Sequence, residues 1–117
     1  MLTVKMNERE YPLAATLRVA YKVQGQHNHK SYIEVFKGIG EMNLEDQVGI
    51  VYAAFECANP EAVREVSKQA FLESYMDTHN LKELMDHIKE IIKGIMGKDF
   101  FEDTDSKENA SGDDAKN

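Results

Sequence analysis

The first residues of the chain alternate between apolar and polar side chains. The apolar positions are Leu2, Val4 and Met6. This two-residue period is typical of a strand with one buried face. A polar turn follows over residues 7–9, beginning with an asparagine that tolerates left-handed backbone geometry. The chain returns over residues 10–13, where Pro12 lacks the N–H that a central strand needs. We therefore predict a β-hairpin over residues 2–13, with its second strand at a sheet edge.

Beyond residue 15 the apolar spacing becomes that of helices. Thr16 and Ser31 are suitable N-cap residues for two short helices, which end near Gly25 and at Gly38–Gly40. Asn43 begins a longer helix, with an aspartate three residues on, in a weaker version of the capping-box spacing. The side chains expected on the apolar faces of these helices are Leu17, Ala20 and Tyr21, then Tyr32, Ile33, Phe36 and Ile39, then Leu44, Val48, Val51, Tyr52 and Phe55.

The second half of the chain carries further helix signals. Asn59-Pro60 places proline where a first helical residue would stand. Ser67 is itself an N-cap residue, so residues 60–77 form either one helix or two. The last helix is the clearest, because Asn80 is followed three residues later by a glutamate and Gly97 suits its end. Its apolar stripe consists of Leu81, Leu84, Met85, Ile88, Ile91, Ile92, Ile95 and Met96.

Charge divides the chain into two parts. Its 117 residues include 14 basic and 21 acidic side chains, a formal charge of −7. Residues 99–117 hold seven acidic and two basic side chains, and no large apolar residue follows Phe101. Such a segment cannot bury enough surface to offset the entropy lost on ordering. We predict one small α+β domain over residues 1–98, mostly helical, with an N-terminal β-hairpin followed by about five helices, and an acidic disordered tail over 99–117.

The acidic balance also narrows the function classes. Binding to nucleic acid or to an anionic membrane depends on clustered Lys and Arg, so neither is expected. No apolar run approaches the roughly 20 residues that cross a bilayer, and the N-terminus does not resemble a secretory leader. The single cysteine, Cys57, cannot form an internal disulfide, and its apolar surroundings indicate a small buried side chain in a reducing compartment. We expect a cytoplasmic protein.

The side chains that could carry catalysis or bind metal do not form a recognisable motif. The four histidines (His27, His29, His79 and His87) lack the spacing of zinc ligands. The carboxylates lie on the polar face of the last helix or in the tail. Gly38 and Gly40 have no preceding strand, which a phosphate-binding loop requires. We therefore predict no catalytic residue, no metal and no cofactor.

Aromatic and methionine side chains are more suggestive. Phe71, Leu72, Tyr75 and Met76 wrap more than half of a short helix. They form either a plain core segment or a groove that receives a partner helix, since methionine suits surfaces that accept varied apolar partners. The Phe100-Phe101 pair, set among acidic residues, is either a short docking motif or packs back on the last helix turn. We take these six residues as candidate partner-binding residues.

The order of elements resembles a known family. A hairpin over residues 4–13 leads into small helices, then a helix over 44–58 containing Val-Tyr-Ala-Ala, then the amphipathic segment 67–76 and the helix 81–96. This is similar to the tail assembly chaperones of long-tailed phages (siphoviruses) and prophages of Gram-positive bacteria. The resemblance covers roughly residues 2–98 and is carried by apolar positions and the hairpin.

The resemblance implies a role in binding rather than catalysis. Such chaperones keep the tape measure protein, a long helical chain, soluble in the host cytoplasm until tail tube subunits polymerise around it, and they are absent from the mature virion. In many phages a frameshift also produces a longer form. Two alternatives stay open from the residues alone, namely a small helical adaptor or regulatory interaction protein of a mobile element, and a small enzyme with a pocket of convergent polar groups.

Overall fold

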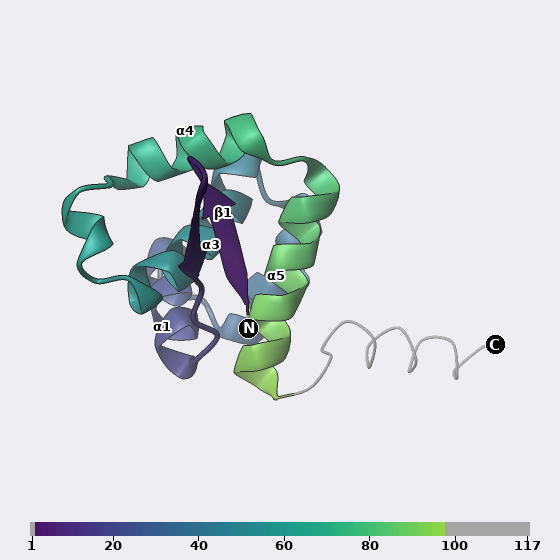
Figure 1. Ribbon diagram of the computed structural model, residues 1–117. Coiled ribbons are helices and arrows are strands. Elements are labelled where there is room, and N and C mark those ends of the chain that lie inside the picture. Colours follow the sequence, from purple (N-terminus) through teal and green to yellow (C-terminus); the bar gives the residue numbers. More distant parts are fainter. Residues whose placement is uncertain (1, 98–117) are drawn as a thin grey trace.

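A computed structural model describes residues 2–97 as a two-stranded antiparallel hairpin followed by five α-helices (Figure 1). The strands are β1 (Thr3–Met6) and β2 (Arg9–Pro12). The α-helices are α1 (Leu17–Gln26), α2 (Tyr32–Lys37), α3 (Leu44–Ala58), α4 (Lys68–Thr78) and α5 (Leu81–Met96). Single 3₁₀ turns, η1 (Ile39–Glu41) and η2 (Ala62–Arg64), precede α3 and α4. The predicted fold class, α+β and mostly helical with an N-terminal hairpin, is confirmed.

The hairpin turn has a specific backbone geometry. Met6 pairs with Arg9, so the loop consists of Asn7 and Glu8, and both have left-handed φ angles (53° and 65°). Two such residues are typical of a type I′ turn, which matches the twist of antiparallel strands. Val4 and Met6 lie on the buried face of β1, whereas most of β2 is exposed. The predicted hairpin with an edge-type second strand is therefore confirmed.

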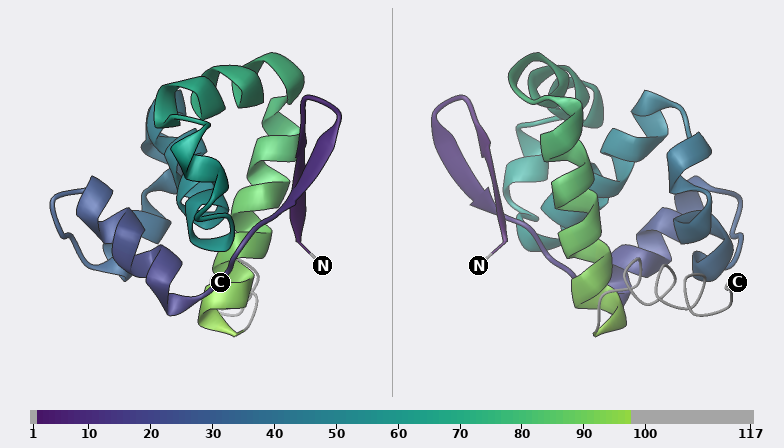
Figure 2. Two further views of the ribbon diagram at one scale, coloured as in Figure 1. Left: turned by 60° about the vertical axis from the view of Figure 1, so that its left-hand side comes forward. Right: turned by 90° about the vertical axis from the view of Figure 1, so that its right-hand side faces the viewer.

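Helix α3 forms the centre of the domain. Nine consecutive residues, from Gln47 to Phe55, are buried, and α1, α4, α5 and β2 all contact this helix. Figure 2 shows α5 and the hairpin on one side of the molecule and α1 with α2 on the other. The sequence pattern indicated a single apolar face, which is wrong for α3. Glycine and alanine at positions between the large side chains let neighbouring helices surround it.

Side-chain caps begin four of the five α-helices. Ser31, Asn43, Ser67 and Asn80 each accept a hydrogen bond from the backbone N–H three residues ahead. Ser67 therefore separates η2 from α4, so the ambiguous segment is not one helix. Asn59-Pro60 leads only into the short turn η2, because Asn59 ends α3 and its side chain donates to the Pro12 and Phe55 carbonyls. The capping box of α5 is confirmed, as is its end at Gly97 (φ 78°).

The first two helices bury only part of the faces expected. In α1 the buried residues are Val19, Ala20 and Val23, while Leu17 and Tyr21 are exposed. Tyr32 of α2 is also exposed, although Phe36 is buried as predicted. Both sides of α1 carry apolar residues, so periodicity alone could not choose the buried one.

The remaining expectations concern the cysteine, membrane spans and the tail. Cys57 is partly rather than fully buried, and burial raises the pKa of its thiol. Within residues 2–97 no helix is both long and apolar enough to span a bilayer. The predicted tail, with Phe100 and Phe101, lies outside the described residues.

Candidate functional site

Exposed apolar side chains concentrate at two places on the described part of the chain. Among residues 2–97 six large apolar side chains are exposed: Leu17, Tyr21, Tyr32, Leu44, Met76 and Leu81. Single exposed apolar residues are common on protein surfaces, whereas groups of them around a concavity are typical of binding sites. Three of the six surround one cavity between α3, α4 and α5, and two others line a cavity between α1, α2 and α5.

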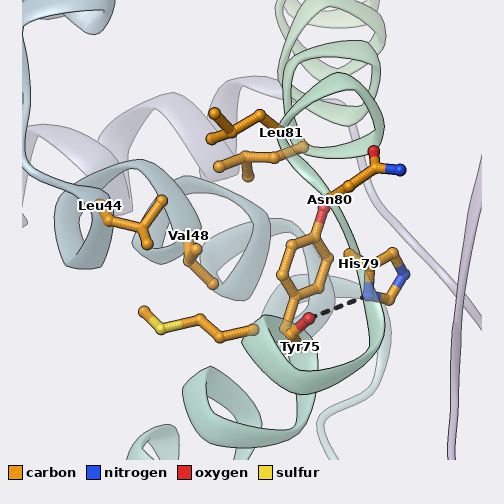
Figure 3. Close-up of a pocket in the computed structure, with 8 residues that line it drawn as sticks. Leu44, Val48, Tyr75, His79, Asn80 and Leu81 are labelled. Carbon is orange, nitrogen blue, oxygen red and sulfur yellow. Dashed lines mark hydrogen bonds between the residues drawn. The ribbon is translucent and has the colours of Figure 1, made fainter.

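The first of these concavities, which we call the apolar groove, has a volume of about 220 Å³. Its lining residues are Leu44, Val48, Tyr75, Met76, His79, Asn80, Leu81 and Leu84. In Figure 3, Leu44 and Val48 of α3 face Tyr75 and Leu81 across the concavity. Three helix ends meet here: the start of α3, the end of α4 and the start of α5.

The caps explain why leucines are exposed at the groove. Leu44 is 44% exposed and directly follows the N-cap Asn43, while Leu81 is 67% exposed and directly follows the N-cap Asn80. A cap fixes where its helix begins, and the first helical side chain then lies at the end of the helix rather than along its packed stripe. The two leucines are therefore held at the mouth of the groove by the same hydrogen bonds that start their helices.

The four residues predicted from α4 divide between the core and the groove. Phe71, Leu72 and Tyr75 are buried, with at most 4% exposure, whereas Met76 is 39% exposed. The expectation that these side chains together form an accessible patch is corrected for the first three. The physical reason is a continuous aromatic core, in which the Phe71 ring lies 4.7 Å from that of Phe55. In this conformation a partner meets α4 chiefly through Met76.

Tyr75 is held by a polar network that the sequence analysis missed. Its hydroxyl oxygen lies 2.7 Å from Nδ1 of His87, whose Nε2 lies 3.2 Å from the Thr3 carbonyl oxygen. A carbonyl can only accept, so Nε2 carries the proton and Nδ1 accepts from the tyrosine hydroxyl. The ring of His79 stacks on Tyr75, with centroids 4.0 Å apart. The network joins β1, α4 and α5.

Burial perturbs both partners of this hydrogen bond. It lowers the pKa of His87 below the ordinary value of 6.5, and the neighbouring His79 lowers it further. Burial, followed by the nearby Glu83 carboxylate, raises the pKa of the Tyr75 hydroxyl. Both effects favour the neutral forms that the hydrogen-bond geometry requires. The i,i+4 spacing of Tyr75 and His79 was the available signal in the sequence, but positions 3 and 87 meet only in the folded chain.

A second, polar cavity of about 320 Å³ lies beside this network. Its lining residues are Thr3, Lys5, Glu10, His79, Glu83, Asp86 and His87. Both ring nitrogens of His87 are already used to hold Tyr75 and Thr3, and the Asp86 carboxylate is paired with Lys82 at 2.9 Å, which lowers its pKa. Across residues 2–97 no group of three or more His, Cys, Asp or Glu side chains could hold a metal ion.

The third concavity, which we call the second apolar cavity, has a volume of about 210 Å³. It is lined by Leu17 and Ala20 of α1, Tyr32 of α2, and Ile95 and Met96 of α5. Leu17 is 77% exposed, more than any other large apolar side chain among residues 2–97. Like Leu81, it is the first residue of its helix.

Comparison with known proteins gives no assignment, because no protein family, curated protein or solved structure matches the chain.

Proposed function

We propose that the protein is a tail assembly chaperone, which binds amphipathic helices of a tape measure protein and keeps them soluble in the bacterial cytoplasm before the tail is assembled. The observation that carries the proposal is the apolar groove, with Leu44, Met76 and Leu81 exposed around a concavity of about 220 Å³. A long amphipathic helix that waits for assembly is prone to aggregate, and a small domain that covers its apolar face prevents this.

The size of the groove favours side chains of a polypeptide as its occupants. Pockets for drug-sized ligands typically have volumes of about 300–1,000 Å³, and the groove is smaller. It has room for one or two apolar side chains, as in helix-in-groove recognition. Met76 adds adaptability, because an unbranched thioether can adjust to different side chains.

Exposed charges next to the groove residues in the sequence further describe a suitable partner helix. Glu45 and Asp77 directly follow Leu44 and Met76, and both acidic side chains are exposed. The nearest lysine along the chain, Lys82, is paired with Asp86. A helix with an apolar stripe flanked by lysine or arginine would therefore fit better than an acidic one.

The catalytic alternative has less support. The polar cavity holds two histidines, but both nitrogens of His87 serve the contact between the hairpin and the helices. Nδ1 of His79 lies 3.1 Å from the Tyr75 carbonyl oxygen and donates to it. A general base needs a free nitrogen directed at a substrate, and His87 has none, because Tyr75 and Thr3 use both of its nitrogens.

A pair of matched variants tests the groove. Leu81→Asp places a charge at the groove, whereas Leu17→Asp makes the same change at an equivalent first helical residue elsewhere. Both positions are exposed, and aspartate is favourable in a first helical turn, so folding should be preserved. Affinity for a fluorescently labelled tape measure helix is measured by anisotropy.

We expect Leu81→Asp to weaken binding at least tenfold, because burying a leucine contributes about 1.5–3 kcal/mol and 1.4 kcal/mol corresponds to a factor of ten. Leu17→Asp should bind like the unaltered protein. Equal affinity of the two variants, or no binding by the unaltered protein, would count against the proposal.

A further inference from the structure

The second apolar cavity lies where the described chain ends. Ile95 and Met96, from the last turn of α5, form one side of it, and Leu17, Ala20 and Tyr32 form the remainder. The connection that leads into α1 approaches α5 closely at this place, because Ala15 lies directly against Gly94. Figure 2 shows the end of α5 next to the start of α1. The chain continues from Gly97, immediately beside an unfilled apolar concavity.

The next large apolar residues in the sequence are Phe100 and Phe101. Phe100 is three positions after Gly97, and an extended chain covers roughly 10 Å over three positions. Gly97 has a left-handed backbone (φ 78°), and its N–H donates to the Lys93 carbonyl, which turns the chain out of the helix direction. The phenylalanine pair is therefore within reach of the cavity at whose edge the helix ends.

Volume and charge both suit this occupant. An apolar cavity of about 150 Å³ in another protein holds a benzene molecule, so about 210 Å³ accepts one phenyl ring. Acidic residues flank the pair at Asp99, Glu102 and Asp103. Exposed cations neighbour the cavity along the chain, since Arg18 follows Leu17 and Lys93 lies one helical turn before Met96.

We propose that the second apolar cavity binds the chain's own Phe100-Phe101 segment, which seals the exposed surface around Leu17 and Tyr32. A tether of two residues gives a local concentration in the millimolar range or above, which exceeds that of a second copy in a dilute solution. The inference is independent of the proposed function. It leaves the apolar groove as the site open to other polypeptides.

Methyl NMR of the full chain tests the proposal. In the unaltered protein the methyl signals of Leu17, Ala20, Ile95 and Met96 should show ring-current shifts that disappear in the double variant Phe100→Ser and Phe101→Ser. Signals of Leu44 and Leu81 should stay in place. As a matched control, Ala110→Ser with Ala115→Ser changes the same tail without removing a ring, and its spectrum should equal that of the unaltered protein.

A second measurement uses the absence of tryptophan from the sequence. In a Phe100→Trp variant, emission should be blue-shifted and partly protected from acrylamide, and adding Leu17→Asp should abolish both effects. Unchanged cavity methyls in the serine variant, or tryptophan fully accessible to acrylamide with Leu17 in place, would overturn the proposal. So would methyl shifts that grow with protein concentration, since those would assign the cavity to a second copy.

Discussion

The contact between Gly94 and Ala15 offers a sharp test of how the connection before α1 is positioned against α5. A β-carbon added at Gly94 would overlap the Ala15 β-carbon and would also lie 3.3 Å from the Ala15 carbonyl oxygen. The clash is with a side chain that has no rotamer to change, so relief requires backbone movement. That backbone is held nearby, because the Leu13 N–H donates to the Leu2 carbonyl at 2.9 Å and the Ala14 N–H to the Ala54 carbonyl at 3.0 Å.

Two opposing effects decide the result of Gly94→Ala. Replacing a helical glycine by alanine contributes about 1 kcal/mol in favour of folding. Overpacking of a close contact typically costs about 1–3 kcal/mol, and the restrained Ala15 backbone favours the upper part of that range. We expect a net destabilisation of about 1–2 kcal/mol, which corresponds to roughly 4–16 °C in Tm for a domain of this size.

Gly25→Ala is the matched control. Gly25 also lies in a helix, but a β-carbon there would meet no atom within 4 Å. This variant should be more stable by about 0.5–1 kcal/mol. Urea unfolding followed by circular dichroism measures both variants. The reasoning is refuted if Gly94→Ala gains stability as Gly25→Ala does, because Ala15 would then not lie against Gly94.

Three further predictions concern the hairpin and its contact with the helices. The pKa of His87 is lower in the folded than in the unfolded protein, so the unfolded chain takes up a proton first as pH falls through about 6.5. The stability contributed by neutral His87 should therefore be complete above that pH and decline below it. Urea midpoints at pH 7.5 and 5.0 measure this decline, which should shrink in His87→Gln and persist in His29→Gln. Tyr75→Phe leaves Nδ1 of the partly buried His87 without its donor and should cost about 1–3 kcal/mol in the same assay. Glu8→Gly relieves a left-handed residue and should raise the free energy of unfolding by up to about 1 kcal/mol, whereas Glu10→Gly in β2 should lower it.

Local signals in the sequence predicted local structure well. A cap is a contact between residues three apart, so Ser31, Asn43 and Asn80 could be identified without knowing the fold. The hairpin was similarly accessible from an asparagine-led polar turn, although the turn predicted over residues 7–9 included Arg9, which belongs to β2. Ser67 shows the limit of such local signals. It indicated a helix start, but the apolar spacing on either side did not decide between one helix and two.

The candidate site depended on contacts between distant segments, and these were less accessible. Phe71 and Met76 belong to the same apolar set in the sequence, yet one joins the aromatic core and the other lines the groove. Which of them is exposed depends on where α3 and α5 lie. The contact of His87 with the Thr3 carbonyl spans 84 positions, so no spacing rule could reveal it. Exposure of Leu17 was equally hidden, because the opposite face of α1 is also apolar.

Co-expression with a fragment of a tape measure protein tests the central claim most directly. If the apolar groove covers amphipathic helices, the fragment should move from the insoluble to the soluble fraction when the unaltered protein or Leu17→Asp is present, and should stay insoluble with Leu81→Asp. A fragment that stays insoluble with the unaltered protein, or that is rescued equally by Leu81→Asp, would contradict the account.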